Sequence, residues 1–284
     1  MTILEQYKQA EQSIVKKYKK AIWNRFIGGI KDYRLIEEGD RIAVCISGGK
    51  DSMLLAKCMQ RLQKYSEFPF SVKYIVMDPG YNEANRKQIT DNAALLGIPV
   101  EIFDTNIFRV VKWGEGSPCY LCARMRRGHL YRAAKEAGCN KIALGHHFDD
   151  VIETILMSML YGGEIKTMMP KLHSTNFEGM ELIRPLYLVR EQDIISWARY
   201  NGLQFIRCAC RFTENLSNED ALGHSKRAEV KQLLAELRKR SGYIDRNIFS
   251  SVHHINLSTV IGYKEGEDEP VHTFLETYER DSQL

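Results

Sequence analysis

The sequence contains no apolar stretch that approaches the roughly 18 residues needed to cross a membrane. Its first residues, MTILEQYKQAEQ, are polar and lack the apolar core of an export signal. The seven cysteines are an odd number, and without an export signal they argue against a disulfide framework. We therefore expect a cytoplasmic protein without a membrane segment, whose cysteines are kept reduced.

Two common phosphate-binding motifs are missing where a phosphate site is expected. The loop SGGKDS at residues 47–52 fits neither GxGxxG nor GxxxxGK[ST]. It follows the apolar stretch RIAVCIS at residues 41–47 and precedes a helical stretch at 53–65. In an open α/β sheet, ligands lie beyond the carboxyl ends of the strands, where a helix N-terminus favours an anion. The loop is therefore a candidate phosphate site of another kind.

The residue types of this loop suit a phosphate chain with a metal ion. Gly48 and Gly49 allow the backbone to approach an anion closely, and Ser47 and Ser52 supply hydroxyl donors. Lys50 adds a positive charge. Asp51 suits a phosphate site once a Mg²⁺ ion lies between the two. A tight turn followed by a capping serine would explain the glycines and serines, but not the Lys-Asp pair.

Apolar stretches alternate with amphipathic ones along most of the chain. The expected strands are residues 41–47, 72–78, 99–105 and 141–147, and the expected helices are residues 3–27, 53–65, 83–97, 119–138, 149–162 and 226–240. This alternation predicts βαβ units, and so an α/β fold with a doubly wound parallel sheet. We expect an N-terminal helical segment at 1–34, a main domain at 35–214, a helical region at 215–263 and an acidic tail at 264–284.

Charge is distributed unevenly along the chain. The tail at residues 264–284 has a net charge of −5, so the rest carries +9 of the total of +4. Basic residues cluster near residues 16–20, 124–127 and 226–240. Such faces suit a phosphate-rich partner, although any single cluster is equally explained as a solvated helix face.

The cysteines divide into two groups. Cys119 and Cys122 form a CxxC at the start of an expected helix, where thiolates are favoured. One such pair fits a redox pair, half of a zinc site or part of an iron–sulfur site. Cys208 and Cys210 follow far downstream in FIRCACRFTE. The three others, which we interpret as structural, are Cys45, Cys58 and Cys139.

Further polar residues are expected at the same edge of the sheet. GHHFDD at residues 145–150 follows the strand at 141–147, and its two aspartates are also ordinary helix caps. Asp78 ends another expected strand, although it could equally serve the turn before Pro79. Arg126 lies four residues after Cys122, which is about one helical turn, and could instead face solvent.

Four segments resemble a known family. The loop at 47–52 is similar to that of the PP-loop (N-type) ATP pyrophosphatases, which cleave ATP between the α and β phosphates. Beyond this loop, the chain resembles the tRNA 2-thiocytidine synthetases (TtcA family) from about residue 30 to 255. The segments that carry this resemblance are residues 35–52, 119–138, 141–172 and 183–194.

The resemblance implies ATP, Mg²⁺ and a [4Fe-4S] cluster as cofactors. It implies that the cluster is held by three thiolates, those of Cys119, Cys122 and Cys208, with Cys210 as the alternative third ligand. Asp51, Asp150 and Arg126 are the residues to which it assigns catalytic roles. The ATP-binding residues that we expect are Ser47, Gly48, Gly49, Lys50, Asp51, Ser52, Asp78, Gly145 and His147.

The implied reaction is ATP-dependent thiolation of tRNA. A pyrimidine carbonyl, in the first instance C2 of an anticodon-loop cytidine, is adenylated, and sulfur then replaces the oxygen. The implied partners are tRNA, a sulfur donor (free sulfide or sulfur from a cysteine desulfurase) and a second copy of the chain in a homodimer.

Several other activities share parts of this pattern. Thiolation of a tRNA uridine uses the same chemistry, although the archaeal thiouridine synthetases carry additional zinc-binding CxxC pairs that this chain lacks. A tRNA lysidine synthetase has the PP-loop but needs no cysteine triad. A redox-sensing, cluster-containing RNA-binding module without catalysis remains a third alternative.

Overall fold

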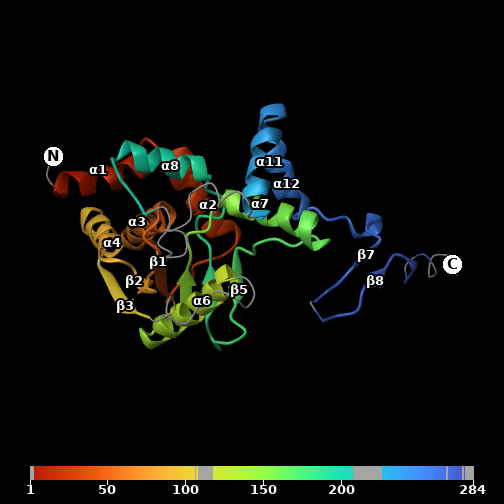
Figure 1. The fold of residues 1–284 in the computed structure, drawn as a ribbon, viewed down its shortest axis with the longest axis horizontal. Helices are drawn as coiled ribbons and strands as arrows, with labels where there is room; N and C mark the ends of the chain where they lie inside the picture. Colours follow the sequence, from red (N-terminus) through yellow and green to blue (C-terminus); the bar gives the residue numbers. More distant parts are fainter. Residues whose placement is uncertain are drawn as a thin grey trace.

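The structure is a computed structural model that describes residues 3–105, 107, 118–206, 226–266, 268–276 and 278. Side chains are described throughout these ranges except at residues 3–5 and 118–123. Cys208 and Cys210 lie outside the described residues, and so does part of the acidic tail. Figure 1 shows a central sheet with helices around it.

The sheet has six strands in the order β3-β2-β1-β4-β6-β5. The bounds are β1 Arg41–Ile46, β2 Ser71–Asp78, β3 Val100–Asp104, β4 Lys141–Ala143, β5 Lys171–His173 and β6 Glu181–Ile183. All neighbouring strands run parallel except β5, which pairs antiparallel with β6 at the edge. The predicted α/β class is confirmed, and the antiparallel β5–β6 hairpin is an addition to the four strands predicted.

The helices largely follow the predicted ranges. They are α1 Ile3–Val15, α2 Asn24–Asp32, α3 Lys50–Tyr65, α4 Glu83–Leu95, α6 Pro118–Glu136, α7 Phe148–Met157, α8 Glu191–Tyr200, α11 Lys226–Arg240 and α12 Ile244–Ser251. The expected helix at 3–27 is interrupted by the π-helical turn η1 (Lys19–Trp23) and continues as α2 to Asp32. A second π-helical turn, η2 (Ser158–Gly162), ends α7.

Helices cover both faces of the sheet, as a doubly wound fold requires. Along β1, Ile42 and Val44 belong to the core beneath α3, whereas Ala43 packs on the opposite face. Tyr131 and Ala134 of α6 complete that second core. The side chains of a strand point alternately to its two faces, so this one buried strand holds both helical layers in place.

Three cysteines are buried in these cores, as predicted: Cys45, Cys58 and Cys139. Burial raises the pKa of the Cys45 and Cys58 thiols far above the ordinary value. Both thiols therefore stay protonated, and they are poor nucleophiles and poor metal ligands.

The two ends of the chain are organised differently. Ile14, Ile22 and Phe26 of the N-terminal helices share a core with β1, whereas α11 packs on α7 through Val230 and Leu234. In Figure 1 the two-stranded β7–β8 hairpin (Gly262–Tyr263 and His272–Thr273) lies apart from the sheet. The four-part domain division stays a prediction, and the first segment packs as part of the main body. None of the described helices is both long and apolar enough to cross a membrane.

The strand order places a ligand crevice next to β1. The chain adds β2 and β3 on one side of β1 and then crosses back to add β4 on the other side. The direction of winding therefore reverses at the boundary between β1 and β4. The loops that leave the carboxyl ends of β1 and β4 face each other at this point, which is where open α/β sheets bind ligands. These are the loops that carry SGGKDS and GHHFDD.

Candidate active site

The loop after β1 is a tight turn tied to the start of α3. The Ser47 amide donates a hydrogen bond to Ser52 Oγ at 3.1 Å, and Ser52 Oγ donates to the carbonyl of Gly49 at 3.0 Å. Gly48 has a φ of +82°, and a Cβ there would lie 2.5 Å from Ile89 Cγ1. Only glycine fits this position, so the backbone is held where the N–H groups of the first turn of α3 are open to an anion.

The loop after β4 is pressed against this turn. A Cβ on Gly145 would lie 2.9 Å from the Ser52 amide nitrogen and 3.0 Å from the Asp51 carbonyl carbon. The two loops are therefore in backbone contact, and a side chain at position 145 would force them apart. The predicted importance of Gly145 has its physical reason here, in packing against the PP-loop.

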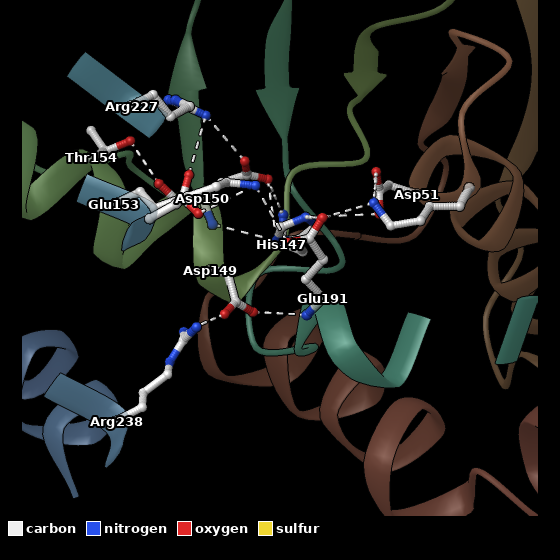
Figure 2. A network of polar contacts seen from close by, with 11 residues as sticks. Asp51, His147, Asp149, Asp150, Glu153, Thr154, Glu191, Arg227 and Arg238 are labelled. Atoms are coloured by element: carbon white, nitrogen blue, oxygen red, sulfur yellow. Dashed lines mark hydrogen bonds and ion pairs between the residues drawn. The ribbon is translucent and has the colours of Figure 1, made fainter. Parts of the chain in front are cut away.

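A cavity of about 490 Å³ opens between these loops. Predicted site residues that line it are Ser47, Asp51, Ser52, Arg126, Gly145, His147 and Asp150. Lining residues that the sequence reasoning did not single out are His146, Glu191, Arg227 and Lys231. Figure 2 shows the polar network on one side of this cavity.

Lys50 and Lys231 share one carboxylate in the network. Lys50 Nζ lies 2.9 Å from Glu191 Oε1, and Lys231 Nζ lies 3.4 Å from Glu191 Oε2. Burial would raise the pKa of Glu191, but Lys50 and Lys231 outweigh it and lower the pKa to about 2. Burial would likewise lower the pKa of Lys50, but Asp51 and Glu191 raise it. Glu191 and Lys50 are thus both charged at neutral pH.

Asp51 is suited to hold a divalent cation. Burial raises its pKa, while Lys50 and His147 act in the opposite direction. Its Oδ1 is buried and accepts no hydrogen bond from any described residue, although Lys50 Nζ lies 3.2 Å away. A buried carboxylate oxygen without a donor, facing a polar cavity beside Asp150, fits the ligand preference of Mg²⁺.

His147 and Asp150 cap α7. The Asp150 amide donates to His147 Nδ1 at 3.4 Å, and the His147 amide donates to Asp150 Oδ2 at 3.0 Å. The capping explanation for this aspartate is therefore correct, yet the residue also faces the cavity. Its second oxygen, Oδ1, lies 3.2 Å from Arg227 Nη1. The His147 Nε2 atom lies 3.8 Å from Asp51 Oδ1, so both predicted residues stand within the site.

The other aspartate of GHHFDD has a different role. Asp149 accepts a hydrogen bond from the Glu191 amide at 2.8 Å and pairs with Arg238 Nη2 at 2.6 Å. It therefore holds the start of α8, which carries Glu191, in place beside the cavity (Figure 2). Asp149 thus positions the helix that carries Glu191, whereas its neighbour Asp150 lines the cavity itself.

Two groups at the cavity have strongly shifted pKa values: the buried Glu153, beside the lining residues, and the half-buried His146, which is one of them. Burial raises the pKa of Glu153 to about 7, despite Lys231 and Arg227 at 3.6 and 3.8 Å from its oxygens. Burial and then the charge of Arg184 lower the pKa of His146 to about 4. His146 is therefore neutral at pH 7, and its Nδ1 atom has no hydrogen-bond partner among the described residues.

Asp78 is placed outside the cavity lining. Its Oδ1 accepts hydrogen bonds from the amides of Gly80 and Tyr81 at 2.8 and 2.7 Å, and its Oδ2 pairs with Arg86 at 3.0 Å. The turn explanation for this residue is the one that the structure supports. Its neighbour Met77 lines the cavity instead. Arg126 reaches the cavity and donates to the Tyr81 hydroxyl at 3.3 Å.

The predicted cluster ligands are only partly within the described residues. Cys119 and Cys122 lie in the first two turns of α6, about two turns and one turn before Arg126, but their side chains are not described. Cys208 lies outside the described residues. In the described part of the chain, no three His, Cys, Asp or Glu side chains are arranged to hold a metal ion. The backbone thus brings the CxxC helix to the cavity, and the ligand set stays a prediction.

The residues missed by sequence reasoning come from distant elements. Arg227 and Lys231 are on α11 and Glu191 begins α8, so they are brought together by the packing of α11 on α7 and by the hydrogen bond from Glu191 to Asp149. A signal was present for α11, because its basic residues had been noted as a possible phosphate-binding face. Nothing in the sequence distinguished Glu153 from a solvated helical glutamate.

Comparisons with known proteins agree with this geometry. Residues 10–221 match the family model described as the PP-loop domain. The tRNA-cytidine(32) 2-sulfurtransferase 1 of Francisella philomiragia is 38% identical over 248 residues, which cover 85% of this chain and 92% of that protein. The tRNA-cytidine(32) 2-sulfurtransferase of Vibrio cholerae is 40% identical over 239 residues, covering 82% of this chain and 73% of the relative.

A solved structure has the same fold. The U34-tRNA thiolase NcsA from Methanococcus maripaludis, determined with its [4Fe-4S] cluster, superposes with a TM-score of 0.61 at 21% identity. The match covers 82% of this chain and 79% of that protein. The chain therefore belongs to the PP-loop domain family and, within it, to the family of the tRNA-cytidine(32) 2-sulfurtransferases.

Proposed function

We propose that this protein is an ATP-dependent tRNA sulfurtransferase that replaces O2 of an anticodon-loop cytidine, at position 32, with sulfur. The observation that carries the proposal is one cavity in which the SGGKDS loop, with Asp51, meets Asp150 and Arg126. Relatives named for this reaction match most of the chain at 38–40% identity. No described residue of the cavity argues for a different chemistry.

ATP is bound by its phosphate end at the PP-loop. The N-terminus of α3, the hydroxyls of Ser47 and Ser52 and the ammonium of Lys50 stabilise the pyrophosphate as charge builds on it. Asp51 and Asp150 would hold Mg²⁺, which would offset negative charge on the phosphates. The cytidine O2 attacks the α-phosphate, and pyrophosphate leaves toward the loop.

Sulfur delivery is assigned to the end of the cavity next to α6. Cys119, Cys122 and Cys208, with Cys210 as the alternative third ligand, would hold a [4Fe-4S] cluster. When bound, such a cluster supplies an iron that can carry sulfide for transfer. Arg126, one turn beyond Cys122, faces the cavity and is placed to bind the phosphate of the adenylated base, which departs as AMP.

The test is anaerobic incubation of the cluster-containing protein with unmodified tRNA, ATP, Mg²⁺ and sulfide. We expect 2-thiocytidine in the digested tRNA by mass spectrometry, and its loss in Cys119→Ala. Cys139→Ala is the matched control, because Cys139 is buried away from the proposed ligands and should leave thiolation intact. Thiouridine in place of thiocytidine would favour the uridine alternative. An unchanged tRNA under all conditions would favour an RNA-binding module without catalysis.

A further inference from the structure

Helix α11 presents two cations to the nucleotide cavity from the side opposite the CxxC helix. Arg227 and Lys231 are four residues apart, so they lie on the same face of the helix, and both line the cavity. The side chains of both are about half exposed. Their charged ends are therefore at the site and also accessible to solvent.

The partners of these cations belong to the PP-loop network. Lys231 pairs with Glu191, the carboxylate that Lys50 also uses, and Arg227 pairs with Asp150, which caps α7 with His147. Lys231 is thus linked through Glu191 to Lys50, and Arg227 is linked through Asp150 to His147. Lys50 and His147 are both predicted ATP-binding residues. Val230 and Leu234 pack the apolar face of α11 on α7, and this packing holds both pairs in place.

Other basic residues of α11 are directed elsewhere. Arg238 pairs with Asp149 and Asp245, which are behind the cavity, and Lys239 pairs with Glu236 on the helix surface. The face of α11 that meets the cavity therefore carries Arg227 and Lys231 specifically. A helix that bound RNA phosphates through its general charge would not need to point two cations inward.

The charges of the cavity also call for cations from outside the PP-loop. Three carboxylates line the cavity, those of Asp51, Asp150 and Glu191, and the buried Glu153 lies next to it. A nucleoside triphosphate adds about four more negative charges. The Lys50 ammonium, the Arg126 guanidinium and the N-terminus of α3 together offer less positive charge than this. In a partly buried site, the difference must be met by Mg²⁺ and by further side-chain cations.

We propose that Arg227 and Lys231 bind the phosphate chain of the nucleoside triphosphate, exchanging Asp150, Glu153 and Glu191 for phosphate oxygens. This rests on the ATP site of the proposed function and extends it to a helix outside the matched PP-loop domain, which ends at residue 221. The exchange frees Asp150 for Mg²⁺ and fastens α11 to the nucleotide. α11 therefore distinguishes a triphosphate from AMP.

The test is nucleotide affinity rather than thiolation. The probes are α,β-methylene-ATP, which cannot be cleaved at the bond in question, and AMP, each titrated calorimetrically with Mg²⁺ into the cluster-containing protein. We expect Arg227→Gln and Lys231→Met each to weaken the triphosphate analogue about tenfold, the usual effect of losing a charged hydrogen bond. AMP affinity should change less than about twofold. Lys239→Met, on the same helix, is the matched control and should change neither.

The outcomes separate this proposal from its alternatives. Unchanged affinity for the analogue, or equal weakening of the analogue and AMP, would overturn it, as would weakening confined to tRNA binding. If either variant unfolds, Lys231→Arg keeps the charge and should retain most of the affinity, whereas Arg227→Lys should lose part of it. Selective loss of triphosphate affinity in a protein that makes no thiocytidine would support α11 while rejecting the proposed function.

Discussion

Glu153 is a buried carboxyl group whose protonation state changes near neutral pH. It faces Asp150 on its own helix, Glu191 on α8, and Arg227 and Lys231 on α11. Burial raises its pKa from 4.5 to about 7 in the folded protein. The stability that the protonated carboxyl contributes is therefore fully present below pH 4.5 and is lost as the pH rises through 7.

We expect Glu153→Gln to be more stable than the wild type at pH 8, because the amide removes the need to bury a charge. The gain should be about 1 kcal/mol, since the half-exposed cations of α11 attenuate the cost in the wild type. Near pH 5 the two proteins should have equal stability. Denaturant midpoints at both pH values provide the measurement, and an identical difference at both would contradict the raised pKa.

Gly145 has no room for a side chain. Alanine there would place Cβ 2.9 Å from the Ser52 amide nitrogen, so the PP-loop would have to shift. We expect Gly145→Ala to weaken ATP binding about tenfold or more, because the loop amides would no longer converge on the phosphates. In Gly28→Ala, the new Cβ lies an ordinary 3.8 Å from Leu188 Cδ1, and this control in α2 should bind ATP normally. Equal affinities in both variants would mean that the loops are not tightly coupled.

Among single residues, site residues that are neighbours in the sequence were predictable, whereas partners from distant parts of the sequence were not. Lys50 and Asp51 were recognisable because adjacent residues in a strand-to-helix loop must share a site. Glu191 was not, because only the folded chain shows that its neighbour Asp149 holds its amide. Asp78 is a different case: its carboxylate accepts hydrogen bonds from its own turn, and the ATP contact expected of it stays a prediction.

At the scale of elements, α11 is joined to its neighbours through Arg238. Its guanidinium pairs with Asp149 of α7 at 2.6 Å and with the buried Asp245 of α12 at 2.9 Å. Arg190 also pairs with Asp245, so this carboxylate connects three segments. The connection holds α11 in the position from which it meets the cavity.

We expect Arg238→Met to lower the free energy of unfolding by about 2 kcal/mol, because it removes charged hydrogen bonds from two buried carboxylates. Lys239→Met removes an exposed pair on the same helix and should cost less than about 0.5 kcal/mol. Urea denaturation of the two variants supplies the comparison. Equal, small losses would show that α11 is held by its apolar face alone.

Long elements were predictable and short ones were not. α11 was expected at 226–240 and lies at Lys226–Arg240, because fifteen residues show a clear helical pattern. β5 and β6 have three residues each, and such strands exist only because they pair with each other and with β4. The turn η1 interrupts a continuous helical pattern where the Tyr18 hydroxyl bonds to the Ser196 carbonyl at 2.9 Å, a contact invisible in the sequence.

For the whole molecule, the uneven charge governs encounter with RNA. A body of +9 attracts a polyanion, and a tail of −5 competes with it. We expect tRNA affinity to fall at least about tenfold between 50 and 200 mM salt, because counterions are released on binding. The triple variant Glu265→Gln, Asp268→Asn, Glu269→Gln should bind tRNA about twofold or more tightly at 50 mM salt, with a smaller gain at 200 mM. Fluorescence anisotropy measures both effects, and a salt-independent gain would point to a shape change instead.

The contact of Gly145 with the backbone of Ser52 makes the β1 and β4 loops a single rigid wall. That wall cannot open without disturbing the parallel strands behind it, whereas α11 meets the cavity through side chains alone. We therefore expect nucleotide to enter and pyrophosphate to leave on the α11 side. On that expectation, the turnover rate should depend on how fast those ion pairs re-form after each cycle, and a small molecule bound beneath α11 should slow product release.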